Sequence, residues 1–142
     1  MERFSTKNRL KDKQKNLKEY LDFVTKILPK NLTDYKKDEL VKASCERYFE
    51  KIVEARIDIG FLVVKIKNFR IHSIEESVFK VLSEEKVLDE ALSISLGNAK
   101  SRRNFIIRQY GGIDDEIVFS SLKKELIPDA TKFLEKINLY GK

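Results

Sequence analysis

The stretch VKASCERYFEKIVEARIDIGFLVVKI, residues 41 to 66, decides the fold class, because its apolar residues recur at alternating spacings of four and three. The seam consists of Val41, Cys45, Tyr48, Ile52, Ala55, Ile59, Leu62 and Ile66. This period predicts one long helix of about seven turns, which suits a helical bundle or a coiled dimer. The helix becomes apolar nearly all round at residues 59–66, so we expect its second half to have neighbours on more than one side.

Helical periodicity is also present before this helix. Residues 9–28 place five apolar side chains on one face, and Pro29 ends the segment. Those side chains are Leu10, Leu17, Leu21, Val24 and Leu28. We expect residues 31–37, NLTDYKK, to form a short connection. Asp38 can then cap the long helix by accepting hydrogen bonds from backbone amides of its first turn.

After residue 70 the sequence predicts two more helices before a glycine pair. Ser73 followed three residues later by Glu76 is typical of a capping box at the start of a short helix. We expect the next helix to begin near Ser83 and to end at Gly111 and Gly112.

A last helix follows the glycines, with Asp114 or Asp115 as its cap and a kink or restart at Pro128. No stretch alternates with period two for long enough to indicate a strand. The predicted fold class is therefore all-α: a bundle of about five helices that forms a single domain over residues 1–142.

Composition and charge limit the class of protein further. Cys45 is the single cysteine, so an internal disulfide is excluded. The longest apolar run, FLVV at 61–64, is far shorter than a membrane-spanning helix requires, and the polar N-terminus does not resemble a secretory signal. We therefore expect a cytosolic protein. Its net charge of +6 favours an anionic partner but does not identify one.

A second stretch, RRNFIIRQYGG at residues 102 to 112, gathers polar side chains that indicate a function. Arg103 and Tyr110 are seven residues apart and share one face of the predicted helix. The donors are Arg102, Arg103, Asn104 and Arg108. They include no group that could take a proton, so this set suits phosphate binding. The alternative is a basic helix end that complements the helix dipole, with Tyr110 in the core.

Two blocks carry a resemblance to a known family: ERYFEKIVEARIDIG at 46–60 and RRNFIIRQYGGIDDEIVF at 102–119. Together they resemble the HepT-like branch of the HEPN superfamily, and the similarity runs from about residue 14 to residue 139. The hallmark of that branch is Arg-Asn, a few residues, then His-x-Tyr, an acidic cap and a final helix. The matching residues are Arg103, Asn104 and Tyr110, with Arg47, Glu54 and Asp58 in the helix-two signature.

The resemblance implies an antiparallel helical bundle that forms a homodimer, with the two motifs meeting in one basic cleft. It implies metal-independent cleavage of RNA, without a cofactor, by the toxin of a toxin–antitoxin pair. The partner implied is a small nucleotidyltransferase antitoxin that silences the toxin by adding AMP to the motif tyrosine, here Tyr110. RNA or a nucleotide is the expected ligand, and no metal site is expected.

The sequence departs from the family pattern at Arg108, which stands where the motif histidine is expected. A guanidinium stays protonated and cannot serve as a general base, but it can hold a scissile phosphate and stabilise charge on its oxygens. Two hypotheses follow. The protein is an endoribonuclease, or it is a catalytically degenerate HEPN domain that binds RNA, a nucleotide or a partner protein. A third hypothesis is that the protein is a purely structural helical adaptor.

Other proton acceptors are few. His72 is the single histidine and is interpreted as a structural residue, because nothing near it in sequence supplies a partner base or nucleophile. Glu54 and Asp58 lie one turn apart and could face the arginines as proton acceptors. They could instead neutralise Arg102 or Arg103 in a partly buried ion pair.

Overall fold

The computed structural model of the protein describes residues 2–71, 78–97 and 115–140, and all of its regular elements in those ranges are helical. In chain order they are α1 (Glu2–Ile27), α2 (Leu32–Lys37), α3 (Glu39–Lys67), α4 (Val78–Glu84), a helix at residues 90–97, α6 (Asp115–Ser121), a π-helical turn (Leu122–Leu126) and α7 (Ile127–Tyr140). The predicted all-α bundle is confirmed.

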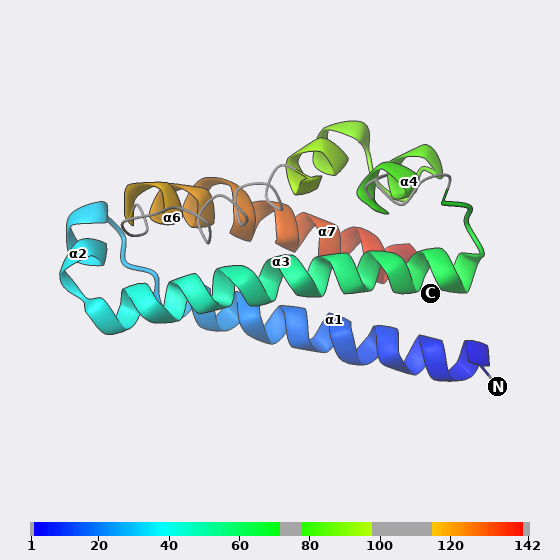
Figure 1. Cartoon of the computed structure of the whole chain (residues 1–142), viewed down its shortest axis with the longest axis horizontal. Helices are drawn as coiled ribbons and strands as arrows, with labels where there is room; N and C mark the ends of the chain where they lie inside the picture. Colours follow the sequence, from blue (N-terminus) through cyan, green and yellow to red (C-terminus); the bar gives the residue numbers. More distant parts are fainter. Residues whose placement is uncertain (1, 72–77, 98–114, 141–142) are drawn as a thin grey trace.

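The two longest helices, α1 and α3, form the centre of the bundle and run antiparallel to each other (Figure 1). Their facing side chains are fully buried, among them Leu17 and Val24 on α1 and Ile52 and Ile59 on α3. Both helices therefore have the amphipathic faces that the spacing of their apolar residues predicts. The predicted seam lies in the core or against it along its whole length.

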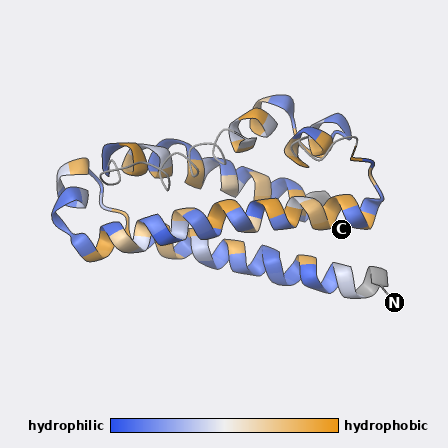
Figure 2. Ribbon diagram, in the orientation of Figure 1, coloured by the Kyte–Doolittle hydropathy of each residue, from blue (hydrophilic) through white to orange (hydrophobic). Residues whose placement is uncertain are grey.

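The remaining helices cover α3 from another side. α7 runs parallel to α3 and antiparallel to α1 (Figure 1), and the Gln14 amide of α1 donates a hydrogen bond to Asn138 of α7. α4 packs on the second half of α3, where apolar residues are concentrated (Figure 2). The second half of α3 therefore has neighbours on more than one side, as predicted.

Both ends of α3 are capped. The Asp38 carboxylate accepts hydrogen bonds from the amides of Leu40 and Val41, each at 3.1 Å, as the sequence predicts. At the other end Asn68 has a φ of 56°, the left-handed conformation that commonly terminates a helix. These caps fix the length of α3, and with it the positions of the helices that pack along it.

One element was missed, because residues 31–37 are not a simple connection. They contain the six-residue helix α2, which begins after Asn31. The Asn31 side chain accepts a hydrogen bond from the amide of Asp34 at 2.8 Å, and Tyr35 is fully buried. The helix packs against α3 and α6, so tertiary burial of Tyr35 stabilises a segment too short to be a stable helix alone.

The predicted helix start near Ser83 is wrong. α4 continues to Glu84, the chain turns at Lys86 with a φ of 61°, and the next helix begins only at residue 90. Asp89 acts as its N-terminal cap, accepting a hydrogen bond from the Leu92 amide at 2.8 Å. A non-glycine residue with positive φ is uncommon, and no glycine marks this turn in the sequence.

The helix is irregular directly before Pro128, where the sequence predicts a kink or restart. The last helix changes to a π-helical turn at Leu122–Leu126, where the Ile127 amide donates to the Leu122 carbonyl. This bond spans five residues instead of four, and it ends directly before a proline, which has no amide hydrogen to donate. The chain then continues in α7 without a break.

Two predicted features lie outside the described residues: the capping box at Ser73 and Glu76, and the helix end at Gly111 and Gly112. Over the ranges that are described, no helix combines the length and the apolar character needed to cross a membrane.

Gly60 lets α4 approach α3 closely. A Cβ atom at this position would lie 3.1 Å and 3.2 Å from the two methyl groups of Val78. We expect Gly60→Leu to separate the helices and lower the free energy of unfolding by about 1–3 kcal/mol, measured by urea denaturation. Gly97→Ala is the control, because a Cβ there meets no atom within 4 Å. Equal stability of Gly60→Leu and the wild type would contradict this packing.

Candidate functional site

In the sequence, the predicted phosphate-binding motif lies between two segments that are anchored to the bundle. Its side chains fall within residues 98–114, outside the described residues, so their predicted roles remain predictions. They are Arg102, Arg103, Asn104, Arg108 and Tyr110. His72 also lies outside. The structure describes the chain on either side of the motif, up to Gly97 and again from Asp115.

The helix at residues 90–97, which leads into the motif, is held on its inner side. Leu92 and Leu96 are buried in the core, and the Ser95 hydroxyl donates a hydrogen bond to the carboxylate of Asp129 on α7. Apolar burial and a polar link together fix this helix against the bundle. The described chain that precedes the motif in sequence is therefore held against the bundle.

The chain after the motif is anchored at the start of α6. Asp115, at the start of α6, accepts a hydrogen bond from the Lys42 ammonium of α3 at 3.1 Å, and Lys42 also pairs with Glu39 at 3.1 Å. These hydrogen bonds raise the pKa of Lys42. Burial raises the pKa of Glu46, and the nearby carboxylate of Asp115 adds to the effect. Carboxylates thus gather around one lysine at Asp115, the first described residue after the motif.

Close to Asp115, helices α2 and α6 are in contact through aromatic rings. The rings of Tyr35 and Phe119 lie 5.3 Å apart, and burial raises the pKa of the Tyr35 hydroxyl. Cys45 is fully buried nearby, and burial raises the pKa of its thiol to about 11. The thiol is therefore protonated at neutral pH, which agrees with the prediction that Cys45 is a core residue.

The helix-two signature of the family falls on α3, the second long helix of the chain, and its residues lie on the solvent side. Glu54 and Asp58 are exposed, and Asp58 pairs with the Lys13 ammonium of α1 at 3.4 Å. Arg47 pairs with Glu50 on its own helix at 3.4 Å. Whether Glu54 or Asp58 also meets the motif arginines stays a prediction, since the motif lies outside the described residues.

Arg56 is a polar residue that the sequence analysis missed. It is 0% exposed, and none of its three guanidinium nitrogens has a hydrogen-bond partner among the described residues. The guanidinium lies 5.9 Å from the centre of the Phe79 ring. Burial lowers the pKa of Arg56 to about 10, and the carboxylate of Asp129 partly offsets this. Arg56 lies four residues after Ile52 and three before Ile59, which places it on the buried face of the helix. This spacing is the sequence signal that could have identified Arg56 as buried.

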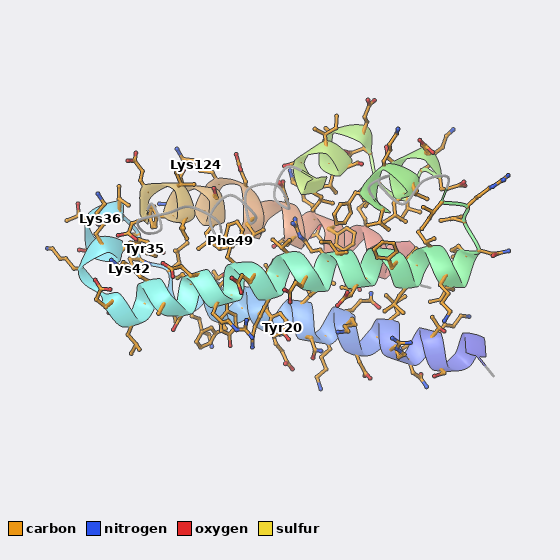
Figure 3. The ribbon with its side chains drawn as sticks, viewed as in Figure 1. Tyr20, Tyr35, Lys36, Lys42, Phe49 and Lys124 are labelled. Atoms are coloured by element: carbon orange, nitrogen blue, oxygen red, sulfur yellow. The ribbon has the colours of Figure 1, made fainter. Side chains whose placement is uncertain are left out.

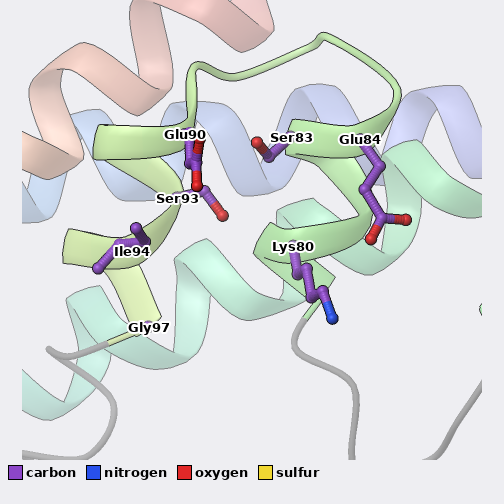
Figure 4. A pocket seen from close by; sticks show the side chains of 7 residues that line it. All are labelled: Lys80, Ser83, Glu84, Glu90, Ser93, Ile94 and Gly97. Atoms are coloured by element: carbon purple, nitrogen blue, oxygen red, sulfur yellow. The ribbon is translucent and has the colours of Figure 1, made fainter.

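A groove separates α4 from the helix at residues 90–97 (Figure 4). Its volume is about 550 Å³, and five of its seven lining residues are polar or charged. The lining residues are Lys80, Ser83, Glu84, Glu90, Ser93, Ile94 and Gly97. The groove therefore borders the helix that leads into the motif. In the described ranges no three His, Cys, Asp or Glu side chains form a group that could hold a metal ion.

Comparison with known families gives a match over residues 17–137 to the family described as Ribonuclease HepT-like. The chain belongs to the HepT-like ribonuclease family. The match includes both sequence blocks that indicated the resemblance, namely residues 46–60 and 102–119. The family assignment predicted from those blocks is confirmed.

Relatives agree with this assignment. A protein of Archaeoglobus fulgidus named "Putative RNase" is 28% identical over 85 residues, which are 60% of this chain and 63% of that protein. The alignment thus spans less than two thirds of the length of this relative.

Solved structures show the same fold as this chain. A toxin–antitoxin crystal structure with AMP-PNP has a chain that matches with a TM-score of 0.79 at 18% identity, covering 92% of this chain and 97% of that one. A tri-AMPylated HEPN toxin of Shewanella oneidensis, in complex with its MNT antitoxin, matches with a TM-score of 0.79 at 18% identity over 92% and 96% of the two chains. At these identities the likeness concerns the fold alone.

The burial of Arg56 without a hydrogen-bond partner among the described residues leads to a stability prediction. We expect Arg56→Met to raise the free energy of unfolding by about 1–3 kcal/mol, because it replaces a buried cation by an apolar side chain of similar length. Urea denaturation measures the change, and Arg47→Met is the exposed control, expected to change it by less than about 0.5 kcal/mol. A loss of stability in Arg56→Met would show that the buried charge is compensated.

Proposed function

We propose that this protein is a cytosolic HepT-like toxin that binds RNA and cleaves it without a metal ion, in a basic cleft formed by two copies of the chain. The observation that carries the proposal is the family match over residues 17–137, which includes the whole Arg-Asn motif. The anchored chain on both sides of the motif supports it. A net charge of +6 favours the approach of a polyanion.

In this proposal the motif arginines bind the scissile phosphate. Arg103 and Asn104 hold its oxygens, Arg102 adds positive charge, and Arg108 stabilises the charge that develops as the 2′-oxygen attacks phosphorus. The proton of the 2′-hydroxyl needs an acceptor other than Arg108. Glu54 and Asp58 are the carboxylates that the helix-two signature offers for this step.

Arg108 itself favours a second candidate function. Without the motif histidine, the same donors form an anion-binding cleft that has no built-in general base. The protein would then bind RNA, a nucleotide or a partner protein without turnover. The two functions share the cleft and differ in the proton acceptor.

We also propose a small nucleotidyltransferase as the antitoxin partner. The support is the AMPylated HEPN toxin of similar fold, which is in complex with an MNT antitoxin. In this chain Tyr110 stands at the motif tyrosine and is the proposed acceptor of AMP. Adding AMP would place negative charge beside the arginines and compete with RNA phosphate for them.

The nuclease proposal predicts that the purified protein cleaves single-stranded RNA in the presence of EDTA. Arg103→Ala should lower the cleavage rate by at least about a hundredfold, because it removes a charged donor to the developing negative charge. Arg70→Ala, an exposed arginine that follows α3, is the matched control and should keep wild-type activity. Gel analysis of a labelled RNA measures the rates.

Arg108→His separates the two candidate functions. The histidine supplies a base that titrates near neutral pH, so cleavage should gain a pH dependence around 6–7 and become faster. Inert wild-type protein with an active Arg108→His variant would establish the binding function for the natural sequence. If the wild type is inert, Arg108→His is also inert, and RNA is not bound at low salt, the proposed function is wrong.

The silencing proposal predicts that co-expression with the cognate nucleotidyltransferase adds AMP to Tyr110. Intact-mass and peptide mass spectrometry should locate the modification on the peptide that contains this residue. Tyr110→Phe should stay unmodified and keep its toxicity in the presence of the partner, whereas Tyr140→Phe is the control and should be silenced. Silencing of Tyr110→Phe to the wild-type degree would refute the assignment.

A further inference from the structure

An aromatic cluster lies on the solvent side of the α1–α3 pair. The rings of Phe23 and Tyr48 are stacked, with their centres 4.5 Å apart and an interplanar angle of 28°. Tyr20 meets Tyr48 edge to face at 5.8 Å. We refer to Tyr20, Phe23, Tyr48 and the adjacent Lys51 as the aromatic platform. The label of Tyr20 in Figure 3 marks its position where α1 and α3 meet.

Lys51 gives this platform a positive charge. Its ammonium lies 5.3 Å from the ring centre of Tyr20 and 5.2 Å from that of Tyr48. Both distances are within the range of a cation–π interaction, which orients the lysine over the rings. A cation held beside stacked rings can pair with a phosphate while the rings contact a base.

The platform is open to solvent. Phe23 is 41% exposed, and Tyr20 and Tyr48 are half-buried, with their inner edges against the core. Packing against the core explains why the inner edges of Tyr20 and Tyr48 are buried. It does not explain why Phe23 exposes its ring to solvent. The helix that carries Tyr20 and Phe23 is also strongly basic, because α1 has eight Lys and Arg residues against four Asp and Glu residues.

We propose that the aromatic platform is a stacking site for unpaired bases of single-stranded RNA, with Lys51 and the basic residues of α1 binding the adjacent phosphates. This inference rests on the proposed RNA-binding function and adds a second contact region outside the motif. Aromatic rings combined with a basic surface are the usual means of binding single-stranded nucleic acid. The basic charge of α1 favours RNA over an apolar protein partner as the occupant.

A tryptophan reporter tests the contact directly, because the chain contains no tryptophan. Phe23→Trp keeps an aromatic ring on the platform, and a dodecamer of uridine should quench its fluorescence by stacking. Phe61→Trp is the matched control. Phe61 is 48% exposed on the same helix as Tyr48, but 13 residues further along, or about 20 Å. Its fluorescence should not change.

Affinity measurements test the energetic role. In fluorescence anisotropy with the labelled dodecamer, Phe23→Ala should weaken binding about tenfold, as loss of one stacked base predicts, and Phe61→Ala should weaken it less than about twofold. Lys51→Met should reduce the slope of log affinity against log salt by about one, because one phosphate contact is lost. A blunt RNA duplex should be insensitive to Phe23→Ala.

The outcomes separate this inference from the proposed function. If the wild type binds the dodecamer, but Phe23→Ala binds equally well and Phe23→Trp is not quenched, the platform is not a stacking site and the motif proposal still stands. No binding of RNA at low salt would overturn both. If Phe23→Ala changes the oligomeric state in analytical ultracentrifugation while its RNA affinity is unchanged, the platform is a protein contact, and the stacking proposal is wrong.

Discussion

Burial of the α3 seam against α1 is the interaction on which the rest of the structure depends. α3 is long enough to provide one face for α1, another for α4 and a third contact for α7. Because interiors are close-packed, the positions of these helices are fixed by the side chains that α3 presents. The helices that lead into and out of the motif are in turn fixed by their contacts with this framework. The seam therefore supports the site as well as the fold.

The site combines an anchored support with residues whose charge suits RNA. Ser95 and Asp129 link the helix before the motif to α7, and Lys42 holds Asp115 after it. Arg56 lies buried between α4 and α7, where the Asp129 carboxylate partly offsets the cost of its burial. Buried polar groups cost stability unless they are paired, and the Asp129 carboxylate only partly compensates for Arg56.

Much of the fold could be predicted from the sequence, because long amphipathic helices leave a periodic pattern. The seam of α3 was predicted from this pattern, whereas the cap at Asp38 and an irregularity near Pro128 were predicted from the chemistry of single residues. α2 was missed because six residues are too short to show a period, and its stability comes from the burial of Tyr35. The turn at Lys86 was missed because a lysine in a left-handed conformation gives no sequence signal.

The site was less predictable than the fold. The family could be identified from two ordered blocks, whereas the seam assigned Ala55 to the core and passed over Arg56 beside it. Ring contacts between Phe23 and Tyr48 join different helices, so their spacing in sequence does not reveal them. If both proposals hold, RNA is bound at the motif and along the α1–α3 surface.

Photo-crosslinking of a 4-thiouridine dodecamer, followed by mass spectrometry of the linked peptides, tests that claim most directly. We predict crosslinks to peptides from residues 102–110 and to peptides that contain Phe23 or Tyr48. Crosslinks confined to other parts of the chain, in a protein that binds the RNA, would contradict the account.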